Sequence, residues 1–329
     1  MTTAYTNRAN LPLSVAVFLA NDNYDHDSRS NHISTTSLLK ATRQLVLTLR
    51  VPPEELTPDV ANLSASRMGS AIHDSIENAW VEKHEQSLTA LGYPKKIVKR
   101  IRVNPTPVDL TEEPDIIPVY LEQRSEKEIN GFIISGKFDF IGDGRVEDFK
   151  TTSAYTYVSS NKDDDYIMQG SIYRWLNPDI ITRDDMAIIY FFKDWAAVKA
   201  ATDKRYPQAP IVEKVFQLKT VAETEAFIFH KTSEIRKYLN APESEIPHCS
   251  EKELWQSETV YKYYKKPEAK RATKDFKTDR IGAYAHANIN GGFVREIPGT
   301  VRACNYCDAQ SICTQRQQLI ATGQLIAKE

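Results

Sequence analysis

Two carboxylates and a lysine near the middle of the sequence form a pattern that could hydrolyse phosphodiester bonds. Asp148 and Lys150 are two residues apart in a segment with strand character, so their side chains share one face of that strand. Asp139, on the preceding strand, could direct its carboxylate to the same place. Carboxylates of this kind hold Mg²⁺ or Mn²⁺, and the bound ion polarises a phosphate and activates water. A lysine beside them could orient the water or stabilise charge developing on phosphorus.

This pattern has a simpler alternative, because an Asp-x-Lys sequence also occurs as a surface ion pair on a solvated strand. Glu147 is a rival for Asp148, but it falls on the opposite strand face from Lys150. The catalytic interpretation therefore needs support from elsewhere in the chain.

Two helical segments supply that support. His73 and Glu77 are one helical turn apart and follow a stretch of small residues at 69–71. Small residues would let the helix pack closely on a neighbour such as the sheet that carries the carboxylates. Gln169 and Tyr173 share one face of a later helix, about twenty residues after Lys150. Both side chains could contact phosphate or water if that helix returns across the site.

The elements that must position these residues can be read from hydrophobic periodicity. Helices are predicted at 33–50, 65–90, 163–177, 220–240 and 314–328, and strands at 97–103, 116–121, 129–141, 145–149 and 186–192. The Gly-Asp-Gly sequence at 142–144 indicates a hairpin turn between the strands that carry Asp139 and Asp148. The order of elements predicts an α/β or α+β fold with a mixed sheet flanked by helices.

Length and composition agree with a folded enzyme. The chain has 329 residues, with 41% hydrophobic and 26% charged residues, close to the average of soluble globular proteins. No apolar run approaches about 18 residues, so we expect no membrane span and a cytoplasmic location, in a bacterium or a phage-infected cell. We predict three segments: an N-terminal helical segment at 1–60, a catalytic core at 61–242 and a C-terminal lobe at 243–329.

The four cysteines point to a metal site in the C-terminal lobe. Cys304, Cys307 and Cys313 have the spacing C-x2-C-x5-C, and Cys249 lies upstream. In a reducing compartment such a cluster indicates a metal site more than a set of disulfides. Thiolates suit Zn²⁺ and iron–sulfur clusters alike, so the spacing leaves both open. His248 is an alternative ligand, and inert buried thiols are the simplest alternative.

A basic segment with interleaved aromatic residues at 261–277 is a candidate DNA-binding region. The net charge of the chain is only −2, so any contact with phosphates requires a local basic surface. Basic side chains can neutralise phosphates, and rings such as Tyr261, Tyr263, Tyr264 and Phe276 can stack on unpaired bases. A solvated charged loop is the competing interpretation. The candidate residues are Lys262, Lys265, Lys266, Lys270, Arg271 and Lys274.

The ordered motifs GxxIH, GxxD, (D/E)xK and QxxxY resemble the RecB-like branch of the PD-(D/E)XK nuclease superfamily. This branch includes nuclease domains of RecB and AddB, CRISPR-adaptation exonucleases and phage exonucleases. The motifs run from His73 to Tyr173. The resemblance implies a restriction-endonuclease-like core. It implies metal binding by His73, Asp139 and Asp148, catalysis by Lys150 with Gln169 and Tyr173 in support, and further acidic residues at Glu77 and Glu128.

The same resemblance bears on the cysteines. Several RecB-like nucleases hold a [4Fe–4S] cluster with one upstream cysteine and a C-terminal trio of this spacing. That upstream cysteine would be expected near 40–45, where this chain reads KATRQL and has none. Cys249 could replace it if the C-terminal lobe folds back. The resemblance favours iron–sulfur over zinc.

We therefore expect a Mg²⁺- or Mn²⁺-dependent DNA exonuclease, of the kind that acts in phage-type recombination or DNA processing with a single-strand annealing protein or helicase as partner. A structure-specific endonuclease on the same fold is the first alternative. A DNA- or partner-binding module that no longer cuts is the second. The chain has no GxxxxGK[ST] motif, so a motor would have to come from a partner. Polarity, strand preference and oligomeric state are not indicated, although some relatives assemble into rings.

Overall fold

A six-stranded mixed sheet carries the residues singled out above. A computed structural model describes residues 5–21, 27, 29–52 and 56–327 of the chain. The sheet has the strand order β2-β3-β6-β7-β8-β9. Its strands are β2 (Ile101–Val103), β3 (Ile117–Leu121), β6 (Phe140–Gly142), β7 (Arg145–Thr152), β8 (Asp185–Phe192) and β9 (Ile211–Gln217). The pairs β2–β3 and β7–β8 are parallel and the others are antiparallel, which confirms the predicted mixed sheet.

The predicted hairpin is formed by β6 and β7. Its turn contains Asp143 and Gly144, both with positive φ, as tight two-residue hairpin turns require. The strand predicted at 129–141 is wrong in one respect, because it is interrupted before Asp139. Its first part, β5 (Phe132–Lys137), belongs to a second sheet with the order β1-β5-β4. The other strands of that sheet are β1 (His32–Ser34) and β4 (Arg124–Ile129).

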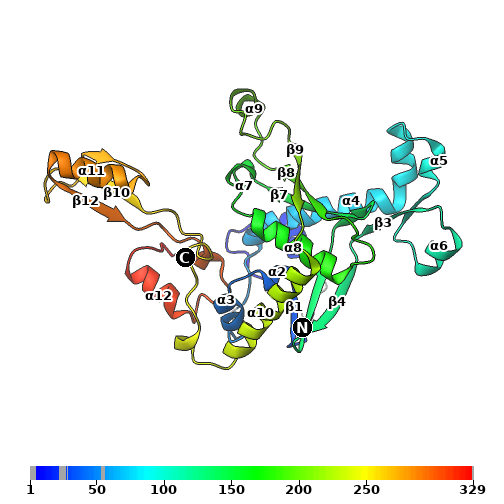
Figure 1. The fold of residues 1–329 in the computed structure, drawn as a ribbon, viewed down its shortest axis with the longest axis horizontal. Coiled ribbons are helices and arrows are strands. Elements are labelled where there is room, and N and C mark those ends of the chain that lie inside the picture. The colour runs from blue at the N-terminus through cyan, green and yellow to red at the C-terminus, as the bar shows by residue number, and fades with distance from the viewer. Residues whose placement is uncertain (1–4, 22–26, 28, 53–55, 328–329) are drawn as a thin grey trace. The chain divides into compact units, whose positions relative to one another are not determined.

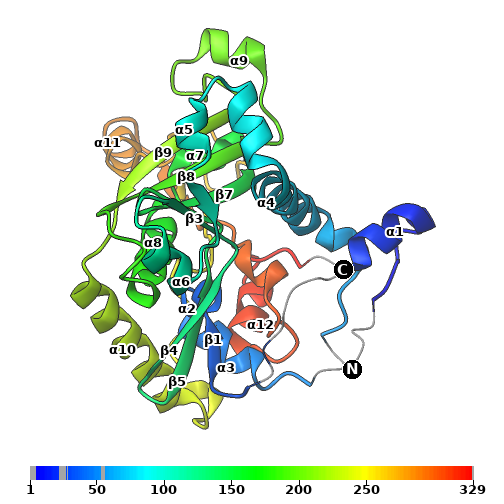
Figure 2. The same ribbon diagram turned by 90° about the vertical axis from the view of Figure 1, so that its right-hand side faces the viewer.

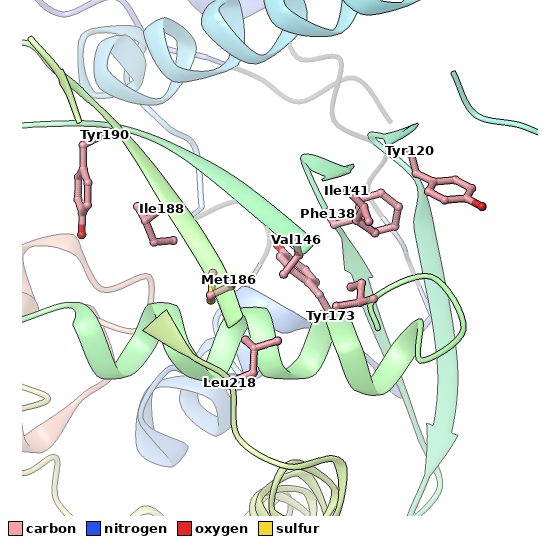
Figure 3. Close-up of a cluster of buried hydrophobic side chains, with 10 residues drawn as sticks. Tyr120, Phe138, Ile141, Val146, Tyr173, Met186, Ile188, Tyr190 and Leu218 are labelled. Carbon is pink, nitrogen blue, oxygen red and sulfur yellow. The ribbon is translucent and has the colours of Figure 1, made fainter. Parts of the chain in front are cut away.

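Two helices cover opposite faces of the large sheet (Figures 1 and 2). Helix α8 (Asp163–Leu176) connects β7 to β8, and Figure 3 shows it beneath Val146, Met186 and Ile188. Helix α4 (Ser64–Ala90) packs Ile76 and Trp80 against Phe149 and its neighbours on the other face. Because β8 is covered on both faces, it reads as an almost continuous apolar run, which confirms the predicted buried strand.

The chain divides into two compact units. Unit 1 contains residues 1–39 and 57–233, and unit 2 contains residues 40–56 and 234–329. This grouping differs from the segment boundaries predicted at 60 and 242. The remaining helices of unit 1 are α1 (Leu13–Ala20), α2 (Thr35–Leu38), η2 (Val60–Leu63), α5 (Lys95–Val98), α6 (Pro107–Glu112), α7 (Ala154–Ser159) and α9 (Ala197–Thr202). Helix α10 (Val221–Tyr238) begins in unit 1 and ends in unit 2.

Unit 2 combines short helices with a three-stranded sheet of its own. The sheet has the order β11-β10-β12. The elements are α3 (Thr42–Thr48), η3 (Glu243–Glu245), β10 (Val260–Tyr264), β11 (Lys274–Asp275), α11 (Arg280–Asn290), β12 (Phe293–Ile297), η4 (Ala303–Tyr306) and α12 (Thr314–Ala321). Among the described residues, no helix is both long enough and apolar enough to cross a membrane.

The predicted helices at 65–90, 163–177 and 220–240 match α4, α8 and α10 closely. The helix predicted at 33–50 is two helices, α2 and α3, with a break between them. Ser34 is the N-cap of α2, and its hydroxyl accepts a hydrogen bond from the backbone of Ser37. The last predicted helix ends at Ala321, and residue 328 of that prediction lies outside the described residues.

The glycines of the motifs differ in how closely neighbouring atoms approach the position that a Cβ atom would occupy. A Cβ atom on Gly170 of α8 would lie 2.2 Å from the sulfur of Met186 on β8. A Cβ atom on Gly136 would lie within 3 Å of Thr35, Tyr173 and Leu176. A Cβ atom on Gly69 of α4 would meet nothing within 4 Å. The close helix packing predicted around residues 69–71 is therefore wrong at Gly69, whereas Gly170 allows α8 to lie directly on the sheet.

We predict opposite effects of alanine at these two helical glycines. Gly170→Ala should lower the free energy of unfolding by about 1–3 kcal/mol, because its methyl group must displace the Met186 side chain from a filled core. Gly69→Ala should raise it by up to about 1 kcal/mol through helix propensity alone. Urea unfolding of both variants measures the difference. Equal effects at the two positions would contradict the packing of α8 on β8.

Candidate active site

The β6–β7 hairpin brings Asp139 and Asp148 together. Asp139 lies just before β6, where the chain passes from the small sheet to the large one. One of its carboxylate oxygens accepts a hydrogen bond of 2.7 Å from the backbone nitrogen of Phe149. This bond fixes Asp139 against the strand that carries Asp148 and Lys150. The second oxygen of Asp139 remains available on the side that faces His73.

His73 reaches this place from helix α4. Its Nε2 lies 3.1 Å from the carbonyl oxygen of Phe149, and its Nδ1 lies 3.4 Å from a carboxylate oxygen of Asp139. The imidazole thus contacts Asp139 itself and the backbone of the residue that follows Asp148. Glu77, one turn further along α4, lies close enough for the charges of Glu122 and Lys137 to affect its carboxyl group.

Glu122 is a member of the cluster that the sequence analysis did not find. Its carboxylate lies 3.6 Å from Nδ1 of His73 and forms an ion pair with Lys137. It directly follows strand β3 and has a φ of 53°, a left-handed conformation that is uncommon for a residue with a side chain. A signal was present in the sequence, because Glu122 is an acidic residue at the end of the apolar run 116–121. His73, Glu122 and Asp139 each offer a ligand atom, and these atoms lie within 4.8 Å of one another.

Asp148 is almost completely buried, and its charge is poorly compensated. Burial raises the pKa of Asp148 to about 6, and the nearby charge of Asp139 adds to this effect against the opposing charge of Lys150. Apart from the ion pair with Lys150, neither of its carboxylate oxygens has a hydrogen-bond partner among the described residues. A buried acceptor without partners is costly. A cation at this position would remove the cost.

At His73 the effect of neighbouring charges on the pKa exceeds the effect of burial. Burial lowers the pKa of its imidazole, but hydrogen bonds to Asp139 and Glu122 outweigh burial and raise the pKa to about 10. Without a metal ion, a protonated His73 therefore supplies part of the positive charge that the carboxylates require.

Lys150 is held on the Asp148 face of β7. Burial lowers the pKa of Lys150, but the charges of Asp148 and Asp139 outweigh burial, so the pKa is raised and the side chain stays an ammonium. Its nitrogen also lies 5.6 Å from the ring centre of Tyr166 on α8. Asp148 and Lys150 share one face of β7, as predicted. Glu147 is on the other face and pairs with Arg145.

Gln169 and Tyr173 lie on the same face of α8, as predicted, and they also contact each other. The amide nitrogen of Gln169 donates a 2.7 Å hydrogen bond to the hydroxyl oxygen of Tyr173. Burial and the nearby charges of Asp148 and Asp139 raise the pKa of Tyr173 well above its ordinary value. Tyr173 is therefore a neutral phenol beside the carboxylates. Since its oxygen already accepts from Gln169, its proton is oriented towards other acceptors.

Glu128 does not join this cluster. It lies on strand β4 of the small sheet, is exposed, and belongs to neither of the ligand groups found among the described residues. The acidic contribution expected at Glu128 is made by Glu122.

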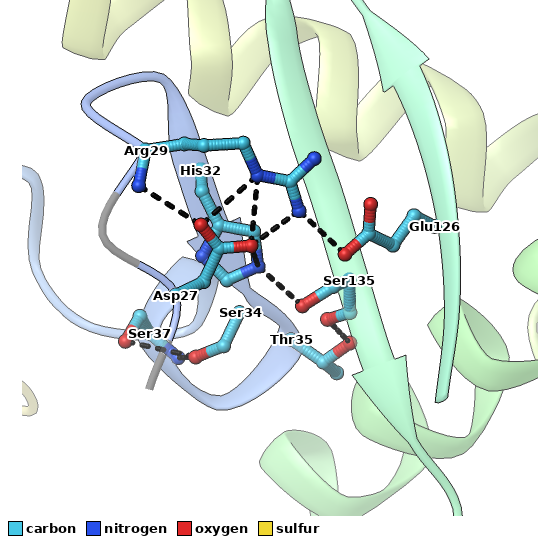
Figure 4. Close-up of polar contacts among 8 residues, drawn as sticks. All are labelled: Asp27, Arg29, His32, Ser34, Thr35, Ser37, Glu126 and Ser135. Carbon is cyan, nitrogen blue, oxygen red and sulfur yellow. Dashed lines mark hydrogen bonds and ion pairs between the residues drawn. The ribbon is translucent and has the colours of Figure 1, made fainter. Parts of the chain in front are cut away.

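A second acidic group, Asp27, His32 and Glu126, lies beside the small sheet (Figure 4). Arg29 already occupies it: its guanidinium donates to both oxygens of Asp27 at 2.9 Å and to Glu126 at 2.6 Å. The hydrogen bonds from Arg29 also lower the pKa of Asp27. Because an arginine supplies the positive charge, we assign no metal ion to this group.

The four cysteines lie near one another in unit 2. Cys249 and Cys304 pack with Leu254, Val301 and Leu325. Gln315 of α12 holds Cys249 by two hydrogen bonds, accepting from its backbone nitrogen at 2.8 Å and donating to its carbonyl oxygen at 3.0 Å. His248 is exposed and joins no ligand group among the described residues.

Buried thiols without a cation resist ionisation. Burial raises the pKa of Cys249 to about 12 and that of Cys304 to about 11, and negative charge on the other cysteines would raise both further. Neither of the ligand groups within 4.8 Å that occur among the described residues contains a cysteine.

The segment 40–45, where the resemblance would place another cysteine, also lies in this unit. Arg43 of helix α3 is buried, and its Nε lies 3.5 Å from the sulfur of Cys313. Its other nitrogens donate to the carbonyl oxygen of Ile246 at 3.0 Å and pair with the carboxylate of Glu243. Glu243 in turn accepts two hydrogen bonds from Thr314, next to Cys313.

The candidate DNA-binding residues lie on and beside the three-stranded sheet of unit 2. Lys262 is half-buried on β10, and the other five are exposed, four of them in the loop that follows β10. The aromatic residues that were expected to stack on bases differ in exposure. Tyr263 is 1% exposed and Tyr264 is 6% exposed, so neither ring is free to contact a base directly.

Comparisons with known proteins agree with this arrangement. The sequence profile of the PD-(D/E)XK nuclease superfamily matches residues 42–314, which include the hairpin and all four cysteines. No curated protein matches the chain.

Solved structures similar to the chain include a protein described as SSO0001, with 17% identity over 69% of this chain and 86% of that one and a TM-score of 0.40. Another is a phage-related exonuclease from Haemophilus somnus 129PT, with 15% identity over 64% of this chain and 97% of that one and a TM-score of 0.26. At these TM-scores neither similarity bears on the activity of this chain.

We predict that Mn²⁺ binding releases protons. At pH 7 His73 carries a proton that must leave before the imidazole can bind a cation, so roughly one proton should be released per ion, and affinity should rise with pH. Calorimetric titration in buffers of different ionisation enthalpy measures the release. His73→Gln should abolish it, whereas His84→Gln, on the same helix but bonded to Trp80, should not. Equal release from both variants would contradict the assignment.

The same imidazole affects the metal-free protein. Its pKa is raised above 6.5 in the folded state, so its stabilising contribution is complete below pH 6.5 and is lost as the pH rises towards 10. Over that range, the unfolding free energy of the metal-free wild type should fall more steeply than that of His73→Gln.

Proposed function

The chain belongs to the PD-(D/E)XK nuclease superfamily, and from that premise we propose that it is a metal-dependent deoxyribonuclease that degrades DNA from free ends. The observation that carries the proposal is the convergence of Asp139, Asp148 and Lys150 on one hairpin with His73 beside them. Nucleases of this superfamily typically use divalent metal ions, and these residue types suit such chemistry.

The donor set fits a hard divalent cation. His73, Asp139 and Asp148 would hold it, with Glu122 as a further carboxylate, and Asp148 offers buried oxygens that lack partners. An imidazole in the set favours Mn²⁺ over Mg²⁺. When bound, such an ion polarises the scissile phosphate and makes water a better nucleophile at neutral pH.

The protein's own residues supply orientation and charge. The ammonium of Lys150, held in place by Asp148, can donate a hydrogen bond to the attacking water or to a phosphate oxygen, where negative charge develops. Tyr173, kept neutral by its raised pKa and positioned by Gln169, can donate a hydrogen bond without adding charge. The buried position of Asp148 keeps bulk water away from these contacts.

An endonuclease on the same fold is the second candidate, because the catalytic cluster does not require a DNA end. A module that binds DNA without cutting is disfavoured, since the motif residues are all present and lie in contact as two pairs, His73 with Asp139 and Lys150 with Asp148. A role in phage-type recombination with an annealing protein or helicase as partner is part of the proposal and rests on the resemblance alone.

We propose in addition that the four cysteines hold a [4Fe–4S] cluster, with zinc as the alternative. The proximity of Cys249 to the C-terminal trio supports a four-thiolate site, and the resemblance to RecB-like nucleases favours a cluster over a single zinc ion. When bound, the cluster would crosslink segments of unit 2 and couple their folding to metal.

We expect linear DNA, and not covalently closed DNA, to be degraded when Mg²⁺ or Mn²⁺ is added. Lys150→Ala should lower the rate about 10²–10³-fold, the typical effect of removing one donor that stabilises developing charge. Lys127→Ala is the matched control, because Lys127 is also a strand lysine with a carboxylate partner, Glu225, away from the cluster. Gel assays with end-labelled DNA measure both variants. Cleavage of closed circles would favour the endonuclease, and binding without cleavage under any metal would refute the nuclease assignment.

For the cysteine site, protein purified without oxygen should contain about four irons and four sulfides per chain, with broad visible absorption. Cys304→Ser should lose the iron and lower the melting temperature of the protein. Asp148→Asn, which alters the other metal site, should retain the iron. If the protein contains one zinc per chain and no iron, the site is a zinc site. If it contains neither metal after reconstitution, the cysteines are inert thiols.

A further inference from the structure

The three-stranded sheet of unit 2 and helix α11 form a small module, residues 260–297, which we call the β-module. It contains nine lysines and arginines and four carboxylates, a net charge of +5 in a chain whose net charge is −2. The positive charge that phosphate contacts require is therefore concentrated in this module.

Helix α11 covers one face of the module's sheet (Figure 1). His286 of α11 packs edge-on against Tyr263 of β10, with ring centres 4.7 Å apart, and Tyr284 donates a hydrogen bond to Glu296 of β12. Side chains alternate along a strand, so the neighbours of Tyr263 and Glu296 must point to the opposite face. Among the described residues, α11 is the one helix that makes extensive contacts with these strands, and it lies on the face of Tyr263. We call it the open face.

The open face carries an arginine fixed on two stacked aromatic rings. Tyr264 and Phe293 are paired across β10 and β12, and their rings stack with centres 5.6 Å apart. The guanidinium of Arg295 lies 4.6 Å from the ring centre of Tyr264. It also donates a 3.0 Å hydrogen bond to the carbonyl oxygen of Pro267. Arg295 is exposed in spite of these contacts, so one side of its guanidinium rests on a ring while the residue still faces solvent.

The hydrogen bond to Pro267 places the basic loop after β10 next to the open face. That loop contains Lys265, Lys266, Lys270 and Arg271, all exposed. On the sheet itself Asp275 lies 4.0 Å from Lys262 and offsets its charge. The positive charge at the open face therefore comes mainly from Arg295 and the loop.

We propose that the open face binds single-stranded DNA, with Arg295 as the platform on which an unpaired base stacks and the loop lysines and Arg271 as phosphate contacts. A guanidinium plane is a stacking surface for exposed bases, and its cation is attracted to their π-systems. Paired bases inside a duplex are not accessible to such a surface. The proposal rests on the nuclease function and deepens it by naming a single strand as the nucleic acid that the β-module recognises.

In this arrangement the buried tyrosines of segment 261–277 do not stack on bases directly, contrary to what the sequence predicts. Tyr264 is covered by Arg295, and Tyr263 is buried under α11. The role of Tyr264 is to orient Arg295, and the arginine makes the contact with the base.

Binding can be measured without cleavage, so that this proposal and the nuclease function can fail separately. The full chain carrying Lys150→Ala is titrated, with chelator present, into a fluorescein-labelled oligothymidylate of about 30 nucleotides, long enough for several binding sites of this kind, and into a duplex of the same length. Anisotropy gives the dissociation constants. We expect the single strand to bind more tightly than the duplex.

Arg295→Ala should weaken binding of the single strand about tenfold or more, the effect of removing one platform on which a base stacks. Arg295→Lys, which keeps the charge and removes the planar group, should weaken it nearly as much. Arg280→Ala is the matched control, since Arg280 is an exposed arginine of the same module on the α11 side, and should change affinity less than about twofold.

Because Arg295 also holds the loop, a second variant tests the charge contribution without touching the sheet. Lys270→Ala with Arg271→Ala should reduce the slope of log Kd against log salt by about 0.7 for each phosphate that the variant no longer neutralises. Thermal unfolding of all variants checks that the module is folded.

Equal affinities of Arg295→Ala and Arg280→Ala, a preference for duplex, or no binding to either DNA would overturn the proposal. If wild type fails to cut DNA while Arg295→Ala still abolishes single-strand binding, the nuclease function fails and the binding platform stands.

Discussion

The arrangement of unit 1 depends on bringing carboxylates together in a place that water scarcely reaches. Asp139 and Asp148 are both buried, and Glu122 lies beside them. Each carboxylate raises the cost of ionising the next, and burial raises it further. Three cations surround the group: His73 from α4, Lys137 from β5 and Lys150 from β7. These cations do not satisfy Asp148, whose pKa remains raised. A divalent cation bound beside Asp148 would offset this unfavourable burial of charge.

The parts of the site that the sequence could predict are those that depend on local backbone geometry. Asp148 and Lys150 follow from strand alternation, which is local, and the turn at Asp143 and Gly144 follows from the conformations that these residues tolerate. Asp139 was predicted on the neighbouring strand, but the break in that strand was not. The break depends on β5 pairing with β1, a parallel pairing between residues about a hundred positions apart. No local pattern near Asp139 reports it.

Glu122 and Glu128 show the limit in another way. Both are acidic residues close in sequence to Asp139, and a motif cannot rank them. The choice is made by the path of the chain after β3, where Glu122 takes a left-handed conformation and turns towards His73 and Lys137. Glu128 is carried away on β4 into the other sheet. The resemblance implies a further acidic residue near Asp139, and only the tertiary structure identifies it as Glu122.

In unit 2 burial disfavours the charged form of the cysteine thiols, as it does for the carboxylates of unit 1. Buried thiols with raised pKa values remain neutral without a metal, so the four cysteines can pack as an apolar cluster until a cation makes their thiolates favourable. Arg43 occupies the segment in which related nucleases are expected to have a cysteine, and it contacts Cys313 and pairs with Glu243. A guanidinium cannot bind a metal, but it can balance the negative charge of a four-thiolate site. In the proposed site Arg43 would therefore supply counter-charge from this segment, and Cys249 would be the fourth thiolate.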